Sequence, residues 1–171
     1  AHYVRPGTAL DDEALARGTS VYLADQVVPM LPEALSNRLC SLVEGRPRLA
    51  YSVTMTFDAQ GKRRDCRIGK SVIQSVKRNT YRAVQELLDG KDTSEARAIG
   101  RLREPLELFR KWTQVQQKLR EAKGALALES RERKFVFDQR HEVAAVVDYP
   151  RYFSNLLIEE TALAANQAVG D

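Results

Sequence analysis

The chain has 171 residues, of which 43% are hydrophobic and 29% are charged, and its formal net charge is +4. This composition is ordinary for a globular protein and excludes collagen-like, disordered and membrane-spanning chains. The 27 basic and 23 acidic side chains permit a polyanionic partner without requiring one.

A short helix is the first predicted element. Thr8 is a candidate N-cap, Leu10, Ala14 and Leu15 supply apolar residues, and Gly18 stands where a C-terminal glycine cap would. Residues 19–23 form a β-prone run. Two prolines near residue 30 then prevent a long regular element, so we expect a shaped loop that leads into a short helical turn.

Residues 49–57 give the clearest pattern in the sequence. Apolar and small or polar side chains alternate there, which predicts a strand with one buried face made by Leu49, Tyr51, Val53, Met55 and Phe57. Residues 58–61 read as a turn. A second strand through Cys66, Ile68, Val72 and Ile73 would complete an antiparallel hairpin whose turn end carries Lys62, Arg63 and Arg64.

Helical signals dominate the second half of the chain. Thr80 is a candidate N-cap for a helix over residues 81–89 that Gly90 closes. Apolar residues recur at helical spacing over 99–119, where Pro105 must either kink a helix or begin one. Residues 134–138 and 142–149 predict another hairpin, and 151–169 predict a final helix with an apolar side at Phe153, Leu156, Leu157, Leu163 and Ala164. We therefore predict one α+β unit in which antiparallel strands and hairpins pack with helices.

Two cysteines, Cys40 and Cys66, would allow one disulfide in a secreted domain. No signal peptide is visible at the N-terminus, so we expect two reduced core thiols in a cytoplasmic protein with no membrane span.

A self-sufficient catalytic set is missing from the sequence: we find no phosphate-binding glycine loop, no metal-ligand spacing and no nucleophile elbow. The acidic residues 11–13 fit the first turn of a helix, where carboxylates complement the helix dipole. Basic runs at 62–64, 77–78 and 131–134, with tyrosines among them, could contact phosphates and stack on bases. Composition alone favours a solvated charged surface.

Several short blocks make the sequence specific. They include His2-Tyr3-Val4, the run from Pro6 to Asp11, Gly18 to Leu23, Val28 to Pro32, Leu35 to Leu42, Arg48-Leu49-Ala50, Ser71-Val72-Ile73, Thr80-Tyr81, Gly124-Ala125-Leu126, Leu157 to Glu160, and Ala164-Ala165-Asn166. In this order and spacing they resemble the RNB-type catalytic domain of the ribonuclease II and ribonuclease R family. Only the helical region around 90–120 is matched by spacing alone.

The resemblance implies a processive 3′-to-5′ exoribonuclease that hydrolyses single-stranded RNA with Mg²⁺ held by an aspartate cluster. The family's aspartates lie upstream of the His-Tyr-Val block, and a further active-site segment lies downstream. We therefore expect residues 1–171 to be a partial RNB-type domain that holds no catalytic residues or metal ligands, is inactive alone, and works with the remaining segments of the same protein.

Three residues take RNA-binding roles from the resemblance. Tyr22 stands where the family stacks a ring on a base, Tyr81 where a tyrosine lines the cavity near the 3′ end, and Glu159 where a glutamate meets a terminal ribose. Each has a plainer alternative: a half-buried packing residue for Tyr22, a core cover for Tyr81, and a solvated helix residue for Glu159. Leu128 stands where many members place a phenylalanine that clamps terminal bases, and leucine lacks the π-face for that contact.

Three hypotheses follow for the chain. The first is a segment of an exoribonuclease, which the density of matching blocks favours. The second is an RNA-binding module that keeps the cleft without catalysis. The third is a structural or interaction domain that has only inherited the sequence.

Overall fold

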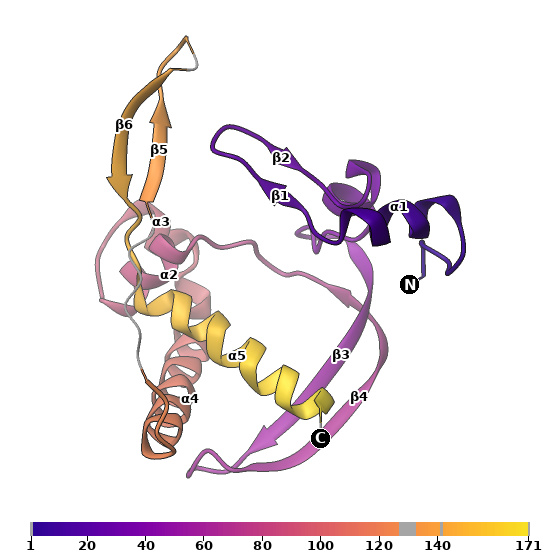
Figure 1. Cartoon of the computed structure of the whole chain (residues 1–171). Coiled ribbons are helices and arrows are strands. Elements are labelled where there is room, and N and C mark those ends of the chain that lie inside the picture. The colour runs from indigo at the N-terminus through magenta and orange to yellow at the C-terminus, as the bar shows by residue number, and fades with distance from the viewer. Residues whose placement is uncertain (1, 127–132, 141, 171) are drawn as a thin grey trace. The chain divides into compact units, whose positions relative to one another are not determined.

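The computed structural model describes residues 2–126, 133–140 and 142–170 (Figure 1). The chain divides into two compact units. The first unit comprises Ala1–Leu49, Val72–Val76 and Arg131–Tyr149. The second comprises Ala50–Ser71, Lys77–Ser130 and Pro150–Asp171. Helices and antiparallel hairpins make up the fold, as the sequence predicts.

The first unit consists of short elements. They are helix α1 (Ala9–Arg17), the antiparallel pair β1 (Val21–Tyr22) and β2 (Val27–Val28), a π-helix (Ala34–Leu39), and the antiparallel pair β5 (Arg133–Phe137) and β6 (Val143–Asp148). Thr8 and Gly18 cap α1 as predicted: the Thr8 side chain accepts from the Asp11 N–H, and Gly18 has φ 68°. None of the described residues of this unit is buried, and the predicted apolar residue Leu15 is 83% exposed.

The long hairpin consists of β3 (Pro47–Phe57) and β4 (Arg63–Gln74). The predicted buried face is correct for Val53, Met55 and Phe57, which are half-buried, and wrong for Leu49 and Tyr51, which are exposed. The alternation changes face at Ser52, whose hydroxyl lies 2.6 Å from that of Ser71 on the paired strand. Alternation therefore predicts the strand, whereas the elements packed beside it decide which face is buried.

The turn of this hairpin is organised by Asp58. Its carboxylate accepts hydrogen bonds from the Gln60 and Lys62 backbone N–H groups, at 3.0 and 2.8 Å, and from the Arg64 guanidinium at 2.8 Å. The Lys62 N–H, helped by Arg64, lowers the pKa of Asp58 below its ordinary value. The carboxylate is consequently ionised at neutral pH and keeps all three contacts.

Gly61 joins this turn to the helical part of the second unit. It is buried with φ 78°, and its carbonyl accepts a 2.7 Å hydrogen bond from the Gln116 side chain. A Cβ at this position would lie 2.5 Å from a methyl group of Val115. Only glycine therefore allows both this backbone conformation and this approach.

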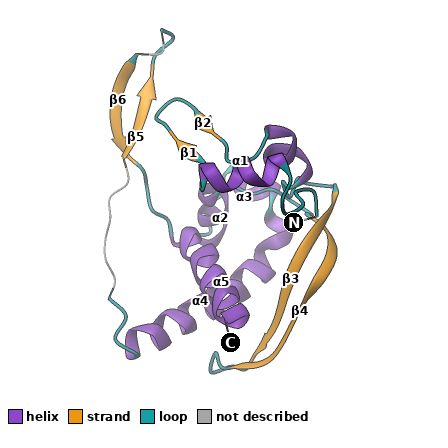
Figure 2. Ribbon diagram, turned by 45° about the vertical axis from the view of Figure 1, so that its right-hand side comes forward, coloured by secondary structure: helices purple, strands orange, loops and turns teal. Residues whose placement is uncertain are grey.

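Four helices form the core of the second unit: α2 (Tyr81–Leu88), α3 (Ser94–Ala98), α4 (Arg103–Ala122) and α5 (Phe153–Gly170), with a 3₁₀ turn at Gly100–Leu102 (Figure 2). The buried cluster contains Ala83, Val84, Leu87, Leu88, Ala96, Ile99 and Leu157, against which Leu102, Leu106, Phe109 and Phe153 pack. Thr80 caps α2 as predicted. Pro105 lies in the first turn of α4, where its missing N–H costs no helix bond, so it begins this helix.

Both cysteines are free, but the prediction of core thiols is wrong for Cys40, which is exposed, while Cys66 is half-buried. Cys66 belongs to β4, whereas Cys40 follows the π-helix in the unit without buried residues. Across the described residues, no helix is both long enough and apolar enough to cross a membrane.

We expect Gly61→Ala to lower the free energy of unfolding by roughly 2–4 kcal/mol, because backbone strain and overpacking against α4 add together. Urea unfolding followed by the fluorescence of Trp112, the one tryptophan in the sequence, measures this loss. Gly90→Ala, with φ 72° and open space around it, should lose only about 1 kcal/mol. Gly69→Ala has neither problem and should change stability by less than about 0.5 kcal/mol. Equal effects of all three substitutions would contradict the close contact at Gly61.

Candidate functional site

Tyr22 ends the short strand β1, where it is paired with Val27 of β2. Its side chain is 78% exposed, so it does not pack half-buried in the described part of the chain. An exposed ring on a paired strand is free to stack on a flat partner.

Tyr81 is the first residue of α2 and is 39% exposed. The Thr80 hydroxyl caps this helix by accepting from the Ala83 N–H at 3.1 Å, which fixes where α2 begins and where Tyr81 stands. The Tyr81 side chain is only partly covered, so packing over the core accounts for part of its surface and leaves the rest accessible.

Ser154 joins the start of α5 to the start of α2. It is 2% exposed, its hydroxyl donates to the Tyr81 carbonyl at 2.7 Å, and its N–H donates to the Gln85 side chain at 3.1 Å. Glu159 follows five residues later, roughly 7.5 Å further along the helix axis. Tyr81 and Glu159 therefore lie on two helices, α2 and α5, that pack together in the second unit. Tyr22 belongs to the first unit.

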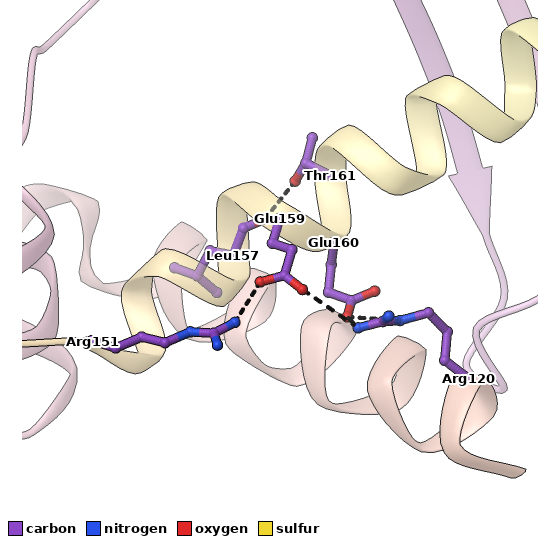
Figure 3. Close-up of polar contacts among 6 residues, drawn as sticks. All are labelled: Arg120, Arg151, Leu157, Glu159, Glu160 and Thr161. Carbon is purple, nitrogen blue, oxygen red and sulfur yellow. Dashed lines mark hydrogen bonds and ion pairs between the residues drawn. The ribbon is translucent and has the colours of Figure 1, made fainter. Parts of the chain in front are cut away.

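Glu159 lies between two guanidinium groups (Figure 3). One carboxylate oxygen is 2.8 Å from Nη2 of Arg151, and the other is 3.9 Å from Nη2 of Arg120 on α4. The side chain is still 41% exposed. Glu159 is thus an accessible carboxylate held by ion pairs, not a freely solvated residue.

Glu160, the neighbour of Glu159, is a buried charged residue that sequence reasoning did not identify. Its side chain is 2% exposed, and Arg120 donates to one of its oxygens from both Nε, at 3.1 Å, and Nη2. A buried carboxylate needs such a charge-assisted pair. The missed signal is spacing: Glu160 comes three residues after the buried Leu157 and therefore lies on the same face of α5.

The two adjacent glutamates therefore differ in what they can bind. The buried Glu160 carboxylate is already paired with the Arg120 guanidinium. Glu159 keeps acceptor positions for an incoming hydroxyl or amine, because a carboxylate offers about four lone-pair sites. The cluster of Arg120, Arg151, Glu159 and Glu160 carries two formal positive and two formal negative charges, so it presents a polar and nearly neutral surface.

An apolar cavity of about 740 Å³ lies within the second unit. Its walls come from β3, the hairpin turn and α4, with Thr161 added from α5, and they include Met55, Phe57, Phe109 and Trp112. Neither Tyr81 nor Glu159 lines it. The lining is mainly hydrophobic, and its two charged residues are Lys111 and Asp58, the second of which is bound to Arg64.

Metal ligands are not grouped in the described part of the chain: no cluster of three or more His, Cys, Asp or Glu side chains there could hold a metal ion. The Arg64 side chain of the basic run 62–64 is bound to Asp58. Leu128 and the first two residues of the run 131–134 lie outside the described residues.

The RNB domain family model matches residues 1–171. The chain is 40% identical over 172 residues to ribonuclease R of Thermotoga maritima and 39% identical over 166 residues to that of Escherichia coli. These alignments cover 100% and 97% of this chain but only 24% and 20% of the relatives, so the chain spans about a quarter of their length or less.

The solved structures that match this chain include RNase R. Mycoplasma genitalium RNase R in complex with ribose methylated single-stranded RNA matches with a TM-score of 0.87 at 28% identity, over 99% of this chain and 26% of that one. Yeast Ssd1, described as a pseudonuclease, matches with a TM-score of 0.63 at 19% identity, over 92% of this chain and 18% of that one. The second likeness shows the fold alone.

Arg120 and Arg151 both contact Glu159 but should differ sharply in their effect on stability. Arg120→Met leaves Glu160 buried without a partner and should cost roughly 3–5 kcal/mol. Arg151→Gln removes a half-exposed ion pair and should cost less than about 1 kcal/mol. Urea unfolding of the two variants measures both values. An equal loss would mean that the Glu160 pair does not stabilise the α4–α5 contact.

Proposed function

The chain belongs to the RNB domain family, and we propose that it is a segment of a processive 3′-to-5′ exoribonuclease that hydrolyses single-stranded RNA. The observation that carries the proposal is the match of the whole chain to the family model, together with about 40% identity to ribonuclease R. A likeness of 28% to RNase R structures with bound single- or double-stranded RNA supports RNA as the partner.

In this proposal the chain contributes residues that hold RNA. Tyr22 stacks on a base of the threaded strand, Tyr81 lines the channel near the 3′ end, and Glu159 accepts a hydrogen bond from a terminal ribose 2′-OH. The exposure of Tyr22, the partial exposure of Tyr81 and the open acceptor positions of Glu159 support these roles. A carboxylate that accepts from the 2′-OH distinguishes RNA from DNA, because DNA lacks this donor.

Hydrolysis of the phosphodiester would use Mg²⁺ when the ion is bound, since such a site activates a water for in-line attack. The described residues do not fit this ion, because they contain no group of three suitable ligands. We therefore assign no catalytic step to the described residues and propose, as the family resemblance implies, that the aspartate cluster lies in other segments of the protein.

An RNA-binding module without catalysis is the second candidate. The fold is shared with yeast Ssd1, described as a pseudonuclease, so the fold by itself is compatible with either candidate. The two candidates predict the same RNA contacts and differ only in whether the intact protein cleaves RNA.

We expect the purified 171-residue chain to leave single-stranded RNA intact in Mg²⁺, because its described residues supply no metal site. Gel analysis of a 5′-labelled RNA oligomer over time measures this. The intact protein is the positive control, and stepwise shortening by it alone supports the exoribonuclease proposal. Stepwise shortening by the isolated chain would contradict the assignment of the metal site to other segments, and no shortening by the intact protein would favour the binding module.

Tyr22→Ala in the intact protein should weaken RNA affinity by roughly 1–3 kcal/mol, the contribution of one stacked base, or change the length of the end product. Fluorescence anisotropy with single-stranded RNA measures the affinity. Tyr51→Ala is a matched control, since Tyr51 is another exposed strand tyrosine and has no proposed RNA contact. Tyr22→Phe should retain most of the affinity. If Tyr22→Ala and Tyr51→Ala behave alike, Tyr22 does not stack on RNA.

Glu159→Ala should narrow the preference of the intact protein for RNA over DNA by roughly three- to tenfold, the net contribution of one hydrogen bond. Affinities for RNA and DNA oligomers of matched sequence give the ratio. Glu121→Ala removes an exposed glutamate near the end of α4 and should leave the ratio unchanged. An unchanged ratio in Glu159→Ala would remove the ribose role.

A further inference from the structure

The Glu159 carboxylate is restrained although its side chain is 41% exposed. An exposed glutamate normally samples many rotamers, and fixing it costs up to about 1.5–2 kcal/mol of conformational entropy. A carboxylate that reads a single hydroxyl works best when it is already in place before the ligand arrives. The contacts that restrain Glu159 therefore bear on specificity.

The first restraint comes from α4 through Arg120. Its guanidinium is fixed by the buried Glu160, which it contacts with both Nε and Nη2. The same Nη2 atom lies 3.9 Å from Oε1 of Glu159. The buried pair thus holds one positive charge at a set place beside the exposed carboxylate (Figure 3).

The second restraint comes from Arg151, two residues before α5 begins. Its Nη2 atom donates to Oε2 of Glu159 at 2.8 Å, eight residues further along the chain. Arg120 and Arg151 therefore contact different oxygens of the same carboxylate. The two contacts together restrict rotation about the last side-chain bond of Glu159, and they leave lone-pair sites for a further donor.

We propose that Arg151 and Arg120 are positioning residues that hold the Glu159 carboxylate in the orientation that accepts a ribose 2′-OH. The inference rests on the proposed ribose role of Glu159. It adds that discrimination between RNA and DNA depends on ion pairs that Glu159 makes with Arg120 of α4 and with Arg151, which precedes α5. The buried Glu160 contributes because it fixes the Arg120 guanidinium.

Arg151 gives the cleaner test, because it is half-exposed and its loss should spare the fold. In the intact protein, Arg151→Gln should lower the ratio of RNA to DNA affinity by roughly three- to tenfold while DNA affinity stays the same. Arg151→Lys should restore part of the ratio, because it returns the charge without the planar fork. Adding Glu159→Ala to Arg151→Gln should cause little further change, since both act on the same contact.

The positioning role of Arg120 is tested with a double substitution, because replacing Arg120 alone would leave the buried Glu160 without its partner. Arg120→Leu with Glu160→Leu replaces the buried ion pair by apolar side chains, which proteins often tolerate. A thermal melt close to that of the unsubstituted protein establishes that the variant is folded. Its RNA-to-DNA affinity ratio should also fall, although Glu159 and Arg151 are both still present.

The outcomes separate this inference from the proposed function. A lower ratio in Glu159→Ala, in Arg151→Gln and in the paired leucine variant supports positioning. A lower ratio in Glu159→Ala alone overturns the positioning role and leaves the ribose contact standing. An equal loss of RNA and DNA affinity in Arg151→Gln also overturns it, because that pattern indicates a phosphate contact. An unchanged ratio in Glu159→Ala overturns the ribose role and this inference together.

Discussion

The buried ion pair between Glu160 and Arg120 is the constraint on which the candidate site depends. A carboxylate that is 2% exposed is tolerated only where a partner neutralises it and satisfies its oxygens. Arg120 can do so only when α4 and α5 lie side by side at the correct level. The pair therefore specifies how the two helices meet, and it brings the accessible Glu159 to a defined place beside Arg120.

Helix α4 connects this pair to the rest of the second unit. Its side chains pack on α2 and α5, and Gln116 holds the turn of the long hairpin through the Gly61 carbonyl. Ser154 ties the start of α5 to the start of α2. Tyr81 and Glu159, which come from different helices, are consequently placed by contacts of the core and not by local loops. The first unit, which carries Tyr22, has no buried residue in its described part.

The fold of this family does not by itself specify its chemistry. The same architecture matches RNase R structures that hold RNA and a yeast pseudonuclease, so the arrangement of helices and hairpins does not decide cleavage. Function lies in particular side chains placed on the fold. Among the described side chains of this chain, no group of three or more His, Cys, Asp or Glu residues could hold a metal ion.

Local chemistry in the sequence determined most of the elements. The threonines at positions 8 and 80 cap helices, Pro105 begins one, and alternation from 49 to 57 makes a strand, because each signal acts within a few residues. The ordered blocks of the sequence also identified the family, which the match to the family model confirms.

Only the tertiary structure decided which side chains are buried or paired. The Arg120–Glu160 pair joins residues 40 positions apart, and the Gln116–Gly61 contact joins residues 55 apart. The exposure of Leu49 and Tyr51 likewise depends on what packs beside the strand. Local patterns cannot encode such contacts, because the partner that makes a buried charge or a close approach tolerable is supplied by a distant segment.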